Sequence, residues 1–295
     1  MKIYKKARLL FTWAFTRVKT TAAIDITSNC NLKCAHCYWW KEERTAELDD
    51  DAMVAFMKGL RSRGMTAAII YGGEPMLRPR MCEAASRIFD HPLVFTNGTQ
   101  GFAAFDAQWI LSLDGTREIH DSIRGPGTYD CVVENLRKAP RRPVVHTTIT
   151  KKNQHNFEEF LDELSGLPVK GVGFSFYTPH RSRDESDLCI PISERDVILD
   201  ELLRLRKKYW RIMGLTASMA NQFRQGGEFS EWNSIEKCPA HKVCNCYNSD
   251  GTPKSCTYGN EADCSRCGCA SIAVYRAAIH HLDPLAIFMI NRMLN

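Results

Sequence analysis

The segment that decides the fold reads CNLKCAHCY, from Cys30 to Tyr38, and it directly follows an apolar, strand-like run at residues 22–27. Its three cysteines, Cys30, Cys34 and Cys37, have the spacing C-x3-C-x2-C. Cysteine thiolates are the usual protein ligands of iron–sulfur clusters, so the segment predicts a loop that holds three irons of a [4Fe–4S] cube. The fourth iron would lack a protein ligand and stay open to a small molecule. A zinc site or three free thiols is the alternative interpretation.

The composition is that of an ordinary globular protein, with 295 residues, 44% hydrophobic and 25% charged. This length can bury one large α/β domain, or one domain with an appendage. The thirteen cysteines are clustered rather than spread, and we expect no export signal, so they indicate metal sites in a reducing cytoplasm. The apolar run at residues 9–15 is far shorter than the ~20 residues that span a bilayer.

The first nineteen residues contain six basic residues and no acid. Their apolar side chains fall on one face of a helical wheel, which predicts a basic amphipathic helix over residues 1–21. Such a helix can lie in the membrane interface, giving a peripheral contact on the cytoplasmic face, or pack across the end of a barrel with a solvated basic face. We expect no nucleic-acid partner, because the basic residues are not interleaved with a stacking surface.

The middle of the chain alternates between strand-like and helical segments. The predicted strands are residues 22–27, 67–71, 93–96, 109–113, 144–150 and 171–177, and the predicted helices are 49–63, 78–89, 128–138 and 157–164. This α/β alternation favours a parallel sheet, here an incomplete (β/α)6 TIM-like barrel over residues 22–190 with its chemistry at the carboxyl ends of the strands. We expect a helical connection over residues 191–235, with helices at 192–211 and 215–225. A cysteine-rich auxiliary region would follow over 236–295, closed by a helix at 271–294.

A second motif, Tyr71-Gly72-Gly73-Glu74-Pro75, follows the second predicted strand. Paired glycines let the backbone approach a ligand closely, and proline fixes the turn, which aims the carboxylate of Glu74 at an ammonium group. Further motifs follow in order: Thr96-Asn97-Gly98, Ser112-Leu113-Asp114-Gly115, and residues 119–125, which read IHDSIRG. Together with the cysteine loop and its aromatic Tyr38, these motifs resemble the radical S-adenosylmethionine (SAM) superfamily over roughly residues 22–180.

The resemblance implies an oxygen-sensitive enzyme that binds a [4Fe–4S] cluster and SAM. SAM would chelate the open iron and be cleaved by one electron to methionine and a 5′-deoxyadenosyl radical, with a flavodoxin or ferredoxin as electron donor. The residues expected to contact SAM are Tyr38, Gly73, Glu74, Asn97, Ser112 and Arg124. Arg124 would face the SAM carboxylate, a charge-assisted contact that suits its planar fork. We expect Asp114 to be a turn residue rather than a ligand.

Seven of the thirteen cysteines lie between Cys238 and Cys269. The spacing Cys238-x12-Gly251-x4-Cys256 resembles the start of the auxiliary-cluster region called SPASM or twitch. Cys264 and Cys267, spaced C-x2-C, would complete one auxiliary [4Fe–4S] cluster. Cys244, Cys246 and Cys269 are surplus or alternative ligands, and zinc competes as the metal. We expect the scattered Cys82, Cys131 and Cys189 to be inert packing residues.

The substrate is the least determined part of the interpretation. The tail, from Cys264 to Gly268 and from His281 to Leu285, resembles radical SAM enzymes that attach adenosyl to hopanoid lipids, and the basic amino terminus agrees with a membrane lipid or isoprenoid substrate. The alternative is a ribosomally made peptide, because the Ser112–Gly115 motif and the Cys238–Cys256 spacing resemble peptide maturases. A non-catalytic iron–sulfur or zinc protein is a different class again. Lone histidines such as His146 are more often structural, so we assign no catalytic base.

Overall fold

The structure, a computed structural model, describes residues 19–41, 46–183 and 187–294. Its sheet contains six parallel strands that pair in the order of the chain. These strands are β1 (Thr21–Asp25), β2 (Ala67–Tyr71), β3 (His91–Thr96), β4 (Gln108–Ser112), β5 (Val144–Ile149) and β6 (Gly171–Phe176). The incomplete (β/α)6 barrel is therefore confirmed, and each of the six strands begins and ends within two residues of its predicted bounds.

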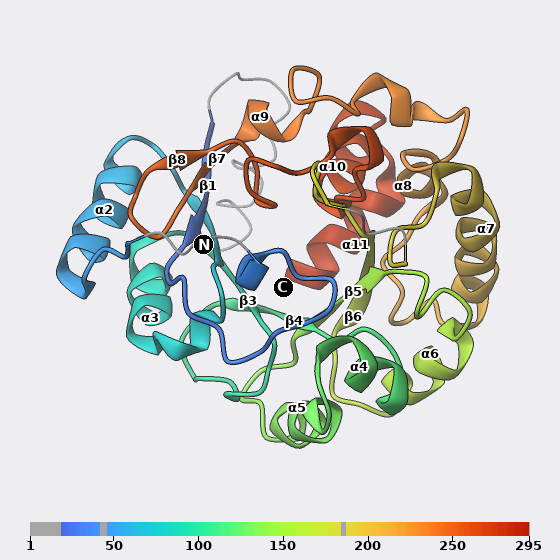
Figure 1. Cartoon of the computed structure of the whole chain (residues 1–295), viewed down its shortest axis with the longest axis horizontal. Helices are drawn as coiled ribbons and strands as arrows, with labels where there is room; N and C mark the ends of the chain where they lie inside the picture. Colours follow the sequence, from blue (N-terminus) through green and yellow to red (C-terminus); the bar gives the residue numbers. More distant parts are fainter. Residues whose placement is uncertain (1–18, 42–45, 184–186, 295) are drawn as a thin grey trace.

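Helices cover the outer face of these strands, as Figure 1 shows. They are α2 (Asp50–Ser62), α3 (Pro79–Ile88), α4 (Arg117–Arg124), α5 (Thr128–Arg137), α6 (Phe157–Ser165) and α7 (Ile192–Lys208). The side chain of Asp49 caps α2 by accepting a 2.8 Å hydrogen bond from the Ala52 N–H, which satisfies one of the unpaired donors of the first turn. Helix α4 contains most of the 119–125 motif, for which the sequence analysis predicted no helix.

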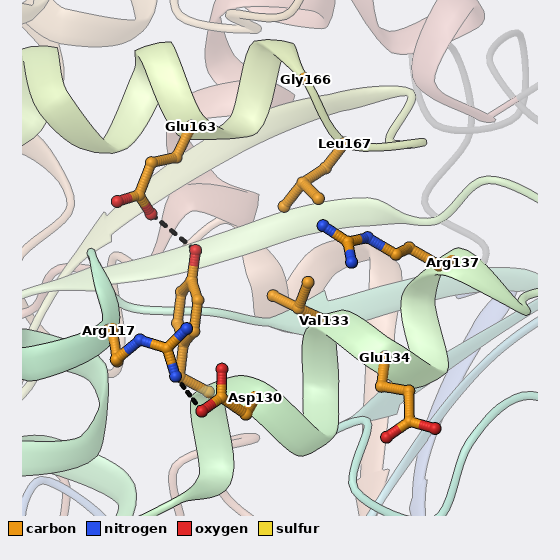
Figure 2. Close-up of a pocket in the computed structure, with 9 residues that line it drawn as sticks. Arg117, Asp130, Val133, Glu134, Arg137, Glu163, Gly166 and Leu167 are labelled. Atoms are coloured by element: carbon orange, nitrogen blue, oxygen red, sulfur yellow. Dashed lines mark hydrogen bonds and ion pairs between the residues drawn. The ribbon is translucent and has the colours of Figure 1, made fainter.

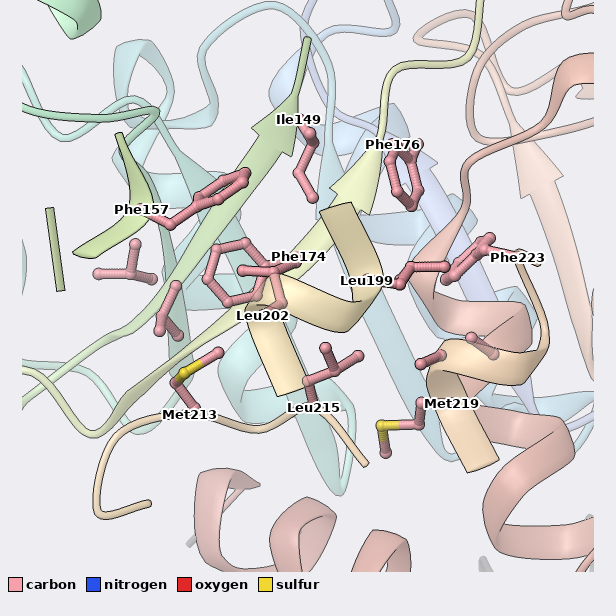
Figure 3. Close-up of a cluster of buried hydrophobic side chains, with 14 of the residues drawn as sticks. Ile149, Phe157, Phe174, Phe176, Leu199, Leu202, Met213, Leu215, Met219 and Phe223 are labelled. Carbon is pink, nitrogen blue, oxygen red and sulfur yellow. The ribbon is translucent and has the colours of Figure 1, made fainter. Parts of the chain in front are cut away.

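Strand alternation separates the core from the inner face of the barrel. Ala22, Ile24 and Ile26 are fully buried and pack with the core beneath α2 and α3, so Ala23 and Asp25 face the barrel interior. A second, larger core joins β5 and β6 to α6, α7 and the carboxyl-terminal helices. Figure 3 shows Phe157, Phe174 and Phe176 in this core, with Leu199 and Leu202 of α7 beside them.

The carboxyl-terminal region adds two strands to the same sheet. Strand β7 (Cys244–Tyr247) pairs parallel with β1, and β8 (Pro253–Lys254) pairs antiparallel with β7, so the sheet has eight strands in the order β6-β5-β4-β3-β2-β1-β7-β8. Figure 1 shows these orange strands beside the blue β1. The sequence predicted no strand here, because four residues containing two cysteines give no apolar run.

The remaining helices are short. They are α8 (Ala217–Asn221), α9 (Ala240–Val243), which was not predicted, α10 (Ala270–Tyr275) and α11 (Pro284–Leu294). The predicted helix at 215–225 is thus reduced to five residues. The predicted helix at 271–294 is divided by a π-helical segment, Arg276–His280, and by Pro284, which can begin a helix but cannot continue one.

The predicted amino-terminal helix falls almost entirely on residues 1–18, which lie outside the described residues. Its last predicted residue, Thr21, begins β1 instead. Among the described helices, none has the length and apolar character needed to cross a bilayer. The boundaries of the four predicted regions stay predictions.

Candidate active site

The cysteine loop leaves the carboxyl end of β1, as predicted, and is held from both sides. On one side, the N–H groups of Gly73 and Glu74 donate to the carbonyls of Thr27 and Asn29, at 3.0 and 2.8 Å. On the other side, the Ala35 N–H donates to the Ile123 carbonyl of α4 at 2.7 Å. Cys30, Cys34 and Cys37 are therefore presented on a loop that the barrel rim fixes in place.

The close contact with the cysteine loop requires glycine at position 73. A Cβ atom on Gly73 would lie 2.1 Å from the Asn29 carbonyl oxygen, and one on Gly72 would lie 2.4 Å from the Thr27 oxygen. Gly72 also has a φ of +131°, which side chains disfavour. The sequence predicted close approach to a ligand at these glycines, whereas in the structure they approach the cysteine loop. The assignment of Gly73 as a SAM contact remains a prediction.

Glu47 is an organising residue that the sequence analysis missed. One of its carboxylate oxygens accepts hydrogen bonds from the Thr27 hydroxyl, the Asn29 amide, and both the N–H and the hydroxyl of Ser28, at 2.6–3.0 Å. Burial alone would raise the pKa of Glu47, but these bonds and the charge of Arg78 together lower it. Nothing in the sequence distinguishes this loop acid from other surface acids.

The three thiols of the loop lie close enough to influence one another electrostatically. Burial, with smaller contributions from neighbouring thiols, raises the pKa of Cys30 to about 11 and that of Cys37 to about 12. Burial also raises the pKa of Cys34, although Arg124 opposes it. Buried thiols of this kind are poor free nucleophiles, and metal binding is what would deprotonate them. The donor set therefore fits an iron–sulfur cluster.

A buried ion pair lies against this loop. Arg124 Nε donates to Asp114 Oδ2 at 2.6 Å, and Arg124 Nη1 lies 4.0 Å from Cys34 Sγ. Asp114 has no exposed side chain and also accepts from the Thr148 N–H at 2.9 Å. Burial would raise the pKa of Asp114, but Arg124, His36 and His120 outweigh it and hold the pKa below its ordinary value. Asp114 thus positions Arg124, whereas the sequence analysis expected Asp114 to be a turn residue.

Glu74 lies at the end of β2, where the motif predicts it, and is buried. Its carboxylate accepts hydrogen bonds from the N–H groups of Met76 and Asn97 and from the Thr96 hydroxyl, at 2.7–2.9 Å. Burial nevertheless raises its pKa, so these bonds do not fully compensate the desolvation of the charge. A carboxylate has about four acceptor positions, which leaves one for a cationic partner.

The other predicted SAM contacts have different surroundings. The Asn97 side chain donates to Asn31 Oδ1 at 3.0 Å and accepts from Thr99, so it supports the cysteine loop. The Tyr38 hydroxyl donates to the Thr257 carbonyl at 2.8 Å, far along the chain. Ser112 faces the barrel interior from the end of β4, and its hydroxyl makes no hydrogen bond within the described part of the chain. Among these three side chains, Ser112 is the one whose polar group remains open to a ligand.

His146 faces the barrel interior. It pairs in register with Ser112, its Nε2 is hydrogen-bonded to Ser175 Oγ at 2.7 Å, and its ring contacts Phe95. Burial lowers the pKa of His146 to about 4, so the ring is neutral at neutral pH. Together with Tyr71, which stacks against Phe95 at 4.4 Å between centroids, it forms an aromatic inner wall below the rim.

The auxiliary cysteines separate into two groups. Five of them act on one another electrostatically: Cys238, Cys256, Cys264, Cys267 and Cys269. Cys244 and Cys246 lie apart in the fold, on β7, where they pair in register with Thr21 and Ala23 of β1, but Cys246 also acts on Cys256. In the described residues, no three His, Cys, Asp or Glu side chains converge as they would on a single metal ion.

A surface hollow of about 570 Å³ lies elsewhere, between α4, α5 and the end of α6. Figure 2 shows that its lining comes from the outer helices, where the charged groups pair with one another: Arg117 with Asp130, and Glu163 with the Tyr129 hydroxyl at 2.6 Å. None of the predicted site residues lines this hollow, so we do not place the active site there.

The fold and the motifs at the strand ends define a class of protein, the partial α/β barrels whose chemistry lies at the carboxyl ends of parallel strands. Within that class, residues 24–167, just under half of the chain, match the Radical SAM superfamily and identify this part of the chain as a radical SAM domain. This family uses a [4Fe–4S] cluster with SAM.

Similar proteins agree with this assignment. The AdoMet-dependent heme synthase of Methanosarcina barkeri is 31% identical over 60% of this chain and 56% of its own length. The mycofactocin maturase MftC of Mycobacterium tuberculosis is 31% identical over 46% of this chain and 39% of its own. The chain therefore spans 56% and 39% of the lengths of these two curated relatives. Streptococcus suis SuiB bound to its precursor peptide SuiA has the same fold, with a TM-score of 0.64 at 14% identity over 96% of this chain and 69% of that chain.

Proposed function

We propose that this chain reductively cleaves SAM at the Cys30/Cys34/Cys37 loop and uses the resulting radical to modify an unactivated carbon of a substrate. The observation that carries the proposal is the meeting of that loop with the Arg124–Asp114 pair, at 4.0 Å from Cys34 Sγ to Arg124 Nη1. When bound, the reduced cluster supplies the electron that cleaves SAM to methionine and a 5′-deoxyadenosyl radical.

The surrounding side chains have separate roles in this proposal. Cys30, Cys34 and Cys37 would hold the cluster. Asp114 occupies the Nε of Arg124 and the Cys34 sulfur lies near Nη1, so Nη2 remains for the carboxylate of SAM. Glu74 would accept the ammonium group of SAM at its remaining acceptor position. The buried rim excludes water, which strengthens these charge-assisted contacts.

We further propose that the substrate is a peptide and that one auxiliary [4Fe–4S] cluster lies beside the barrel. The cluster's ligands would be Cys238, Cys256, Cys264 and Cys267, with Cys246 and Cys269 as competing ligands because both interact electrostatically with Cys256. The similarity to the mycofactocin maturase and the SPASM-like cysteine spacing support the peptide. A tetrapyrrole is the second candidate: the similarity to a heme synthase extends over more of the chain, and the inner wall of Tyr71, Phe95 and His146 suits a planar ring.

A lipid or isoprenoid substrate is still a prediction from the sequence. None of the relatives described above is named as a lipid-modifying enzyme, and the basic amino terminus that supported a lipid lies outside the described residues. Comparative profiling of peptides, tetrapyrroles and lipids in a deletion strain would discriminate between the three classes. Accumulation of an unmodified peptide is the expected outcome, and accumulation of a tetrapyrrole or a lipid precursor instead would overturn the peptide assignment.

The decisive experiment on the chemistry is Glu74→Gln in anaerobically reconstituted protein. We expect iron and sulfide contents equal to those of the parent, and SAM binding weakened about 10- to 100-fold, from the ~1.5–3 kcal/mol of a charge-assisted hydrogen bond. Formation of 5′-deoxyadenosine should fall accordingly. Glu83→Gln on α3, an exposed acid paired with Arg87, is the matched control and should change neither quantity. A parent protein that binds iron but never forms 5′-deoxyadenosine would instead indicate a non-catalytic metal protein.

A further inference from the structure

Arg195 is a fully buried cation that no carboxylate of the described residues neutralises. It lies in the first turn of α7, and none of its surface is exposed. Nη1 donates to the Cys267 carbonyl at 2.9 Å and Nη2 to the Arg266 carbonyl at 2.7 Å. Its Nε has no hydrogen-bond partner in the described chain. The guanidinium stacks on the ring of Phe176 at 4.7 Å, and that of Phe229 lies 5.4 Å away.

This environment is costly for a positive charge. Arginine keeps its proton in proteins, and an ion without a counter-charge in the interior costs several kcal/mol. The first turn of a helix adds to the cost, because the helix dipole is positive there. No ion pair within the described residues involves Arg195, and the groups whose ionisation would oppose its charge are the thiols of Cys189 and Cys267.

Through these two carbonyls Arg195 contacts the segment that carries two of the expected auxiliary ligands. Cys264 and Cys267 flank Arg266, so the two accepting carbonyls belong to this short stretch. The sulfur of Cys267 itself accepts from two other groups, the Cys269 N–H at 3.5 Å and the Thr178 hydroxyl at 4.0 Å. Four thiolates outweigh the positive charge of a [4Fe–4S] core, so the loaded site would be anionic and would gain a further negative charge on reduction.

We propose that Arg195 is the buried counter-charge of the auxiliary cluster and raises the cluster's reduction potential. Reduction potentials of iron–sulfur clusters depend on net charge, hydrogen bonds to sulfur and solvent exposure. A fixed cation therefore stabilises the state that carries one more electron. Reduction adds one electron from an external low-potential donor, and no bond breaks. This inference rests on the auxiliary cluster of the proposed function.

The test uses full-length protein with Cys30, Cys34 and Cys37 replaced by alanine, so that only the auxiliary cluster is titrated. After anaerobic reconstitution, iron and sulfide are counted, and the midpoint potential is measured by dithionite titration with EPR detection. We expect Arg195→Gln to lower the midpoint enough to change the oxidised-to-reduced ratio at a fixed potential at least tenfold, which corresponds to about 59 mV for one electron. Arg195→Lys, which keeps the charge, should stay near the parent value. Arg204→Gln, at an exposed position of the same helix, should match the parent.

The outcomes separate the inference from its premise. A reconstituted triple-alanine parent without iron would refute the auxiliary cluster itself. Equal iron contents with an unchanged midpoint in Arg195→Gln would refute the counter-charge role alone. If Arg195→Gln fails to load iron while Arg195→Lys loads it with the parent's potential, the charge is required and the proposal stands. If both variants fail to load, hydrogen bonding to the Cys267 carbonyl is the essential role, and the counter-charge proposal is wrong.

Discussion

Replacing Asp114 by asparagine tests the geometry of the active site most directly. The substitution preserves the shape of the side chain but removes the counter-charge of Arg124, which lies 2.6 Å away in a pair that is almost wholly buried. Removing one partner of a buried ion pair leaves an uncompensated charge and costs about 3–5 kcal/mol. We therefore expect Asp114→Asn to lower the free energy of unfolding by about this amount, and SAM binding to weaken because Arg124 loses its fixed orientation.

The control is Asp130→Asn, which breaks the exposed Arg117–Asp130 pair on the outer helices. Exposed pairs contribute about 0–1 kcal/mol, so this variant should unfold close to the parent. Urea denaturation followed by circular dichroism gives both values, and equilibrium binding of SAM to the reconstituted protein gives the second readout. Equal destabilisation of the two variants, or full SAM affinity in Asp114→Asn, would refute the positioning role of Asp114.

The same pair predicts a pH dependence with a definite sign. The folded-state pKa of Asp114 lies below its ordinary value, so folding stabilises the ionised form. That stability is fully present above the unfolded pKa of about 4 and is lost as the pH falls through the folded pKa. The difference in unfolding free energy between the parent and Asp114→Asn should therefore be constant near neutral pH and shrink under strongly acidic conditions. A difference that grew as the pH fell would contradict this account.

Further predictions concern the glycine turn, the inner wall and the amino terminus. Gly73→Ala should displace the cysteine loop and reduce iron loading, because the new Cβ would lie 2.1 Å from the Asn29 oxygen. In the control Gly59→Ala in α2, the added Cβ would meet no atom within 4 Å. This variant should load iron normally, and its free energy of unfolding should rise by ~0.5–1 kcal/mol. His146→Phe should preserve iron loading and SAM cleavage while lowering product formation, as measured by the ratio of 5′-deoxyadenosine to modified substrate; an unchanged ratio would exclude His146 from substrate contact. Liposome flotation should depend on residues 1–19 if the lipid hypothesis holds, and equal flotation after their removal would eliminate its main physical support.

Local sequence patterns were sufficient for the barrel strands. Strands buried on both faces need continuous apolar runs, and such runs are visible without any knowledge of the fold. Strand β7 could not be found this way, because Cys244–Tyr247 pairs through its backbone with an edge that β1 supplies. The motif residues lie at the strand ends where the sequence analysis placed them, but the residues that contact them were not predicted. Glu47 and Asp114 act on the cysteine loop through contacts that arise only when distant segments fold together.

The same reasoning explains why the auxiliary region is not a simple appendage to the barrel. A Cβ on Gly268 would lie 1.9 Å from the Phe176 carbonyl, and the Gly268 N–H donates to the Thr178 hydroxyl at 2.9 Å, so this segment is seated against the end of β6. At the other side of the site, the Tyr38 hydroxyl joins the cysteine loop to the carbonyl of Thr257, next to Cys256. The cysteine loop and the auxiliary region are therefore each joined to the barrel, and to each other, by short hydrogen bonds to backbone groups.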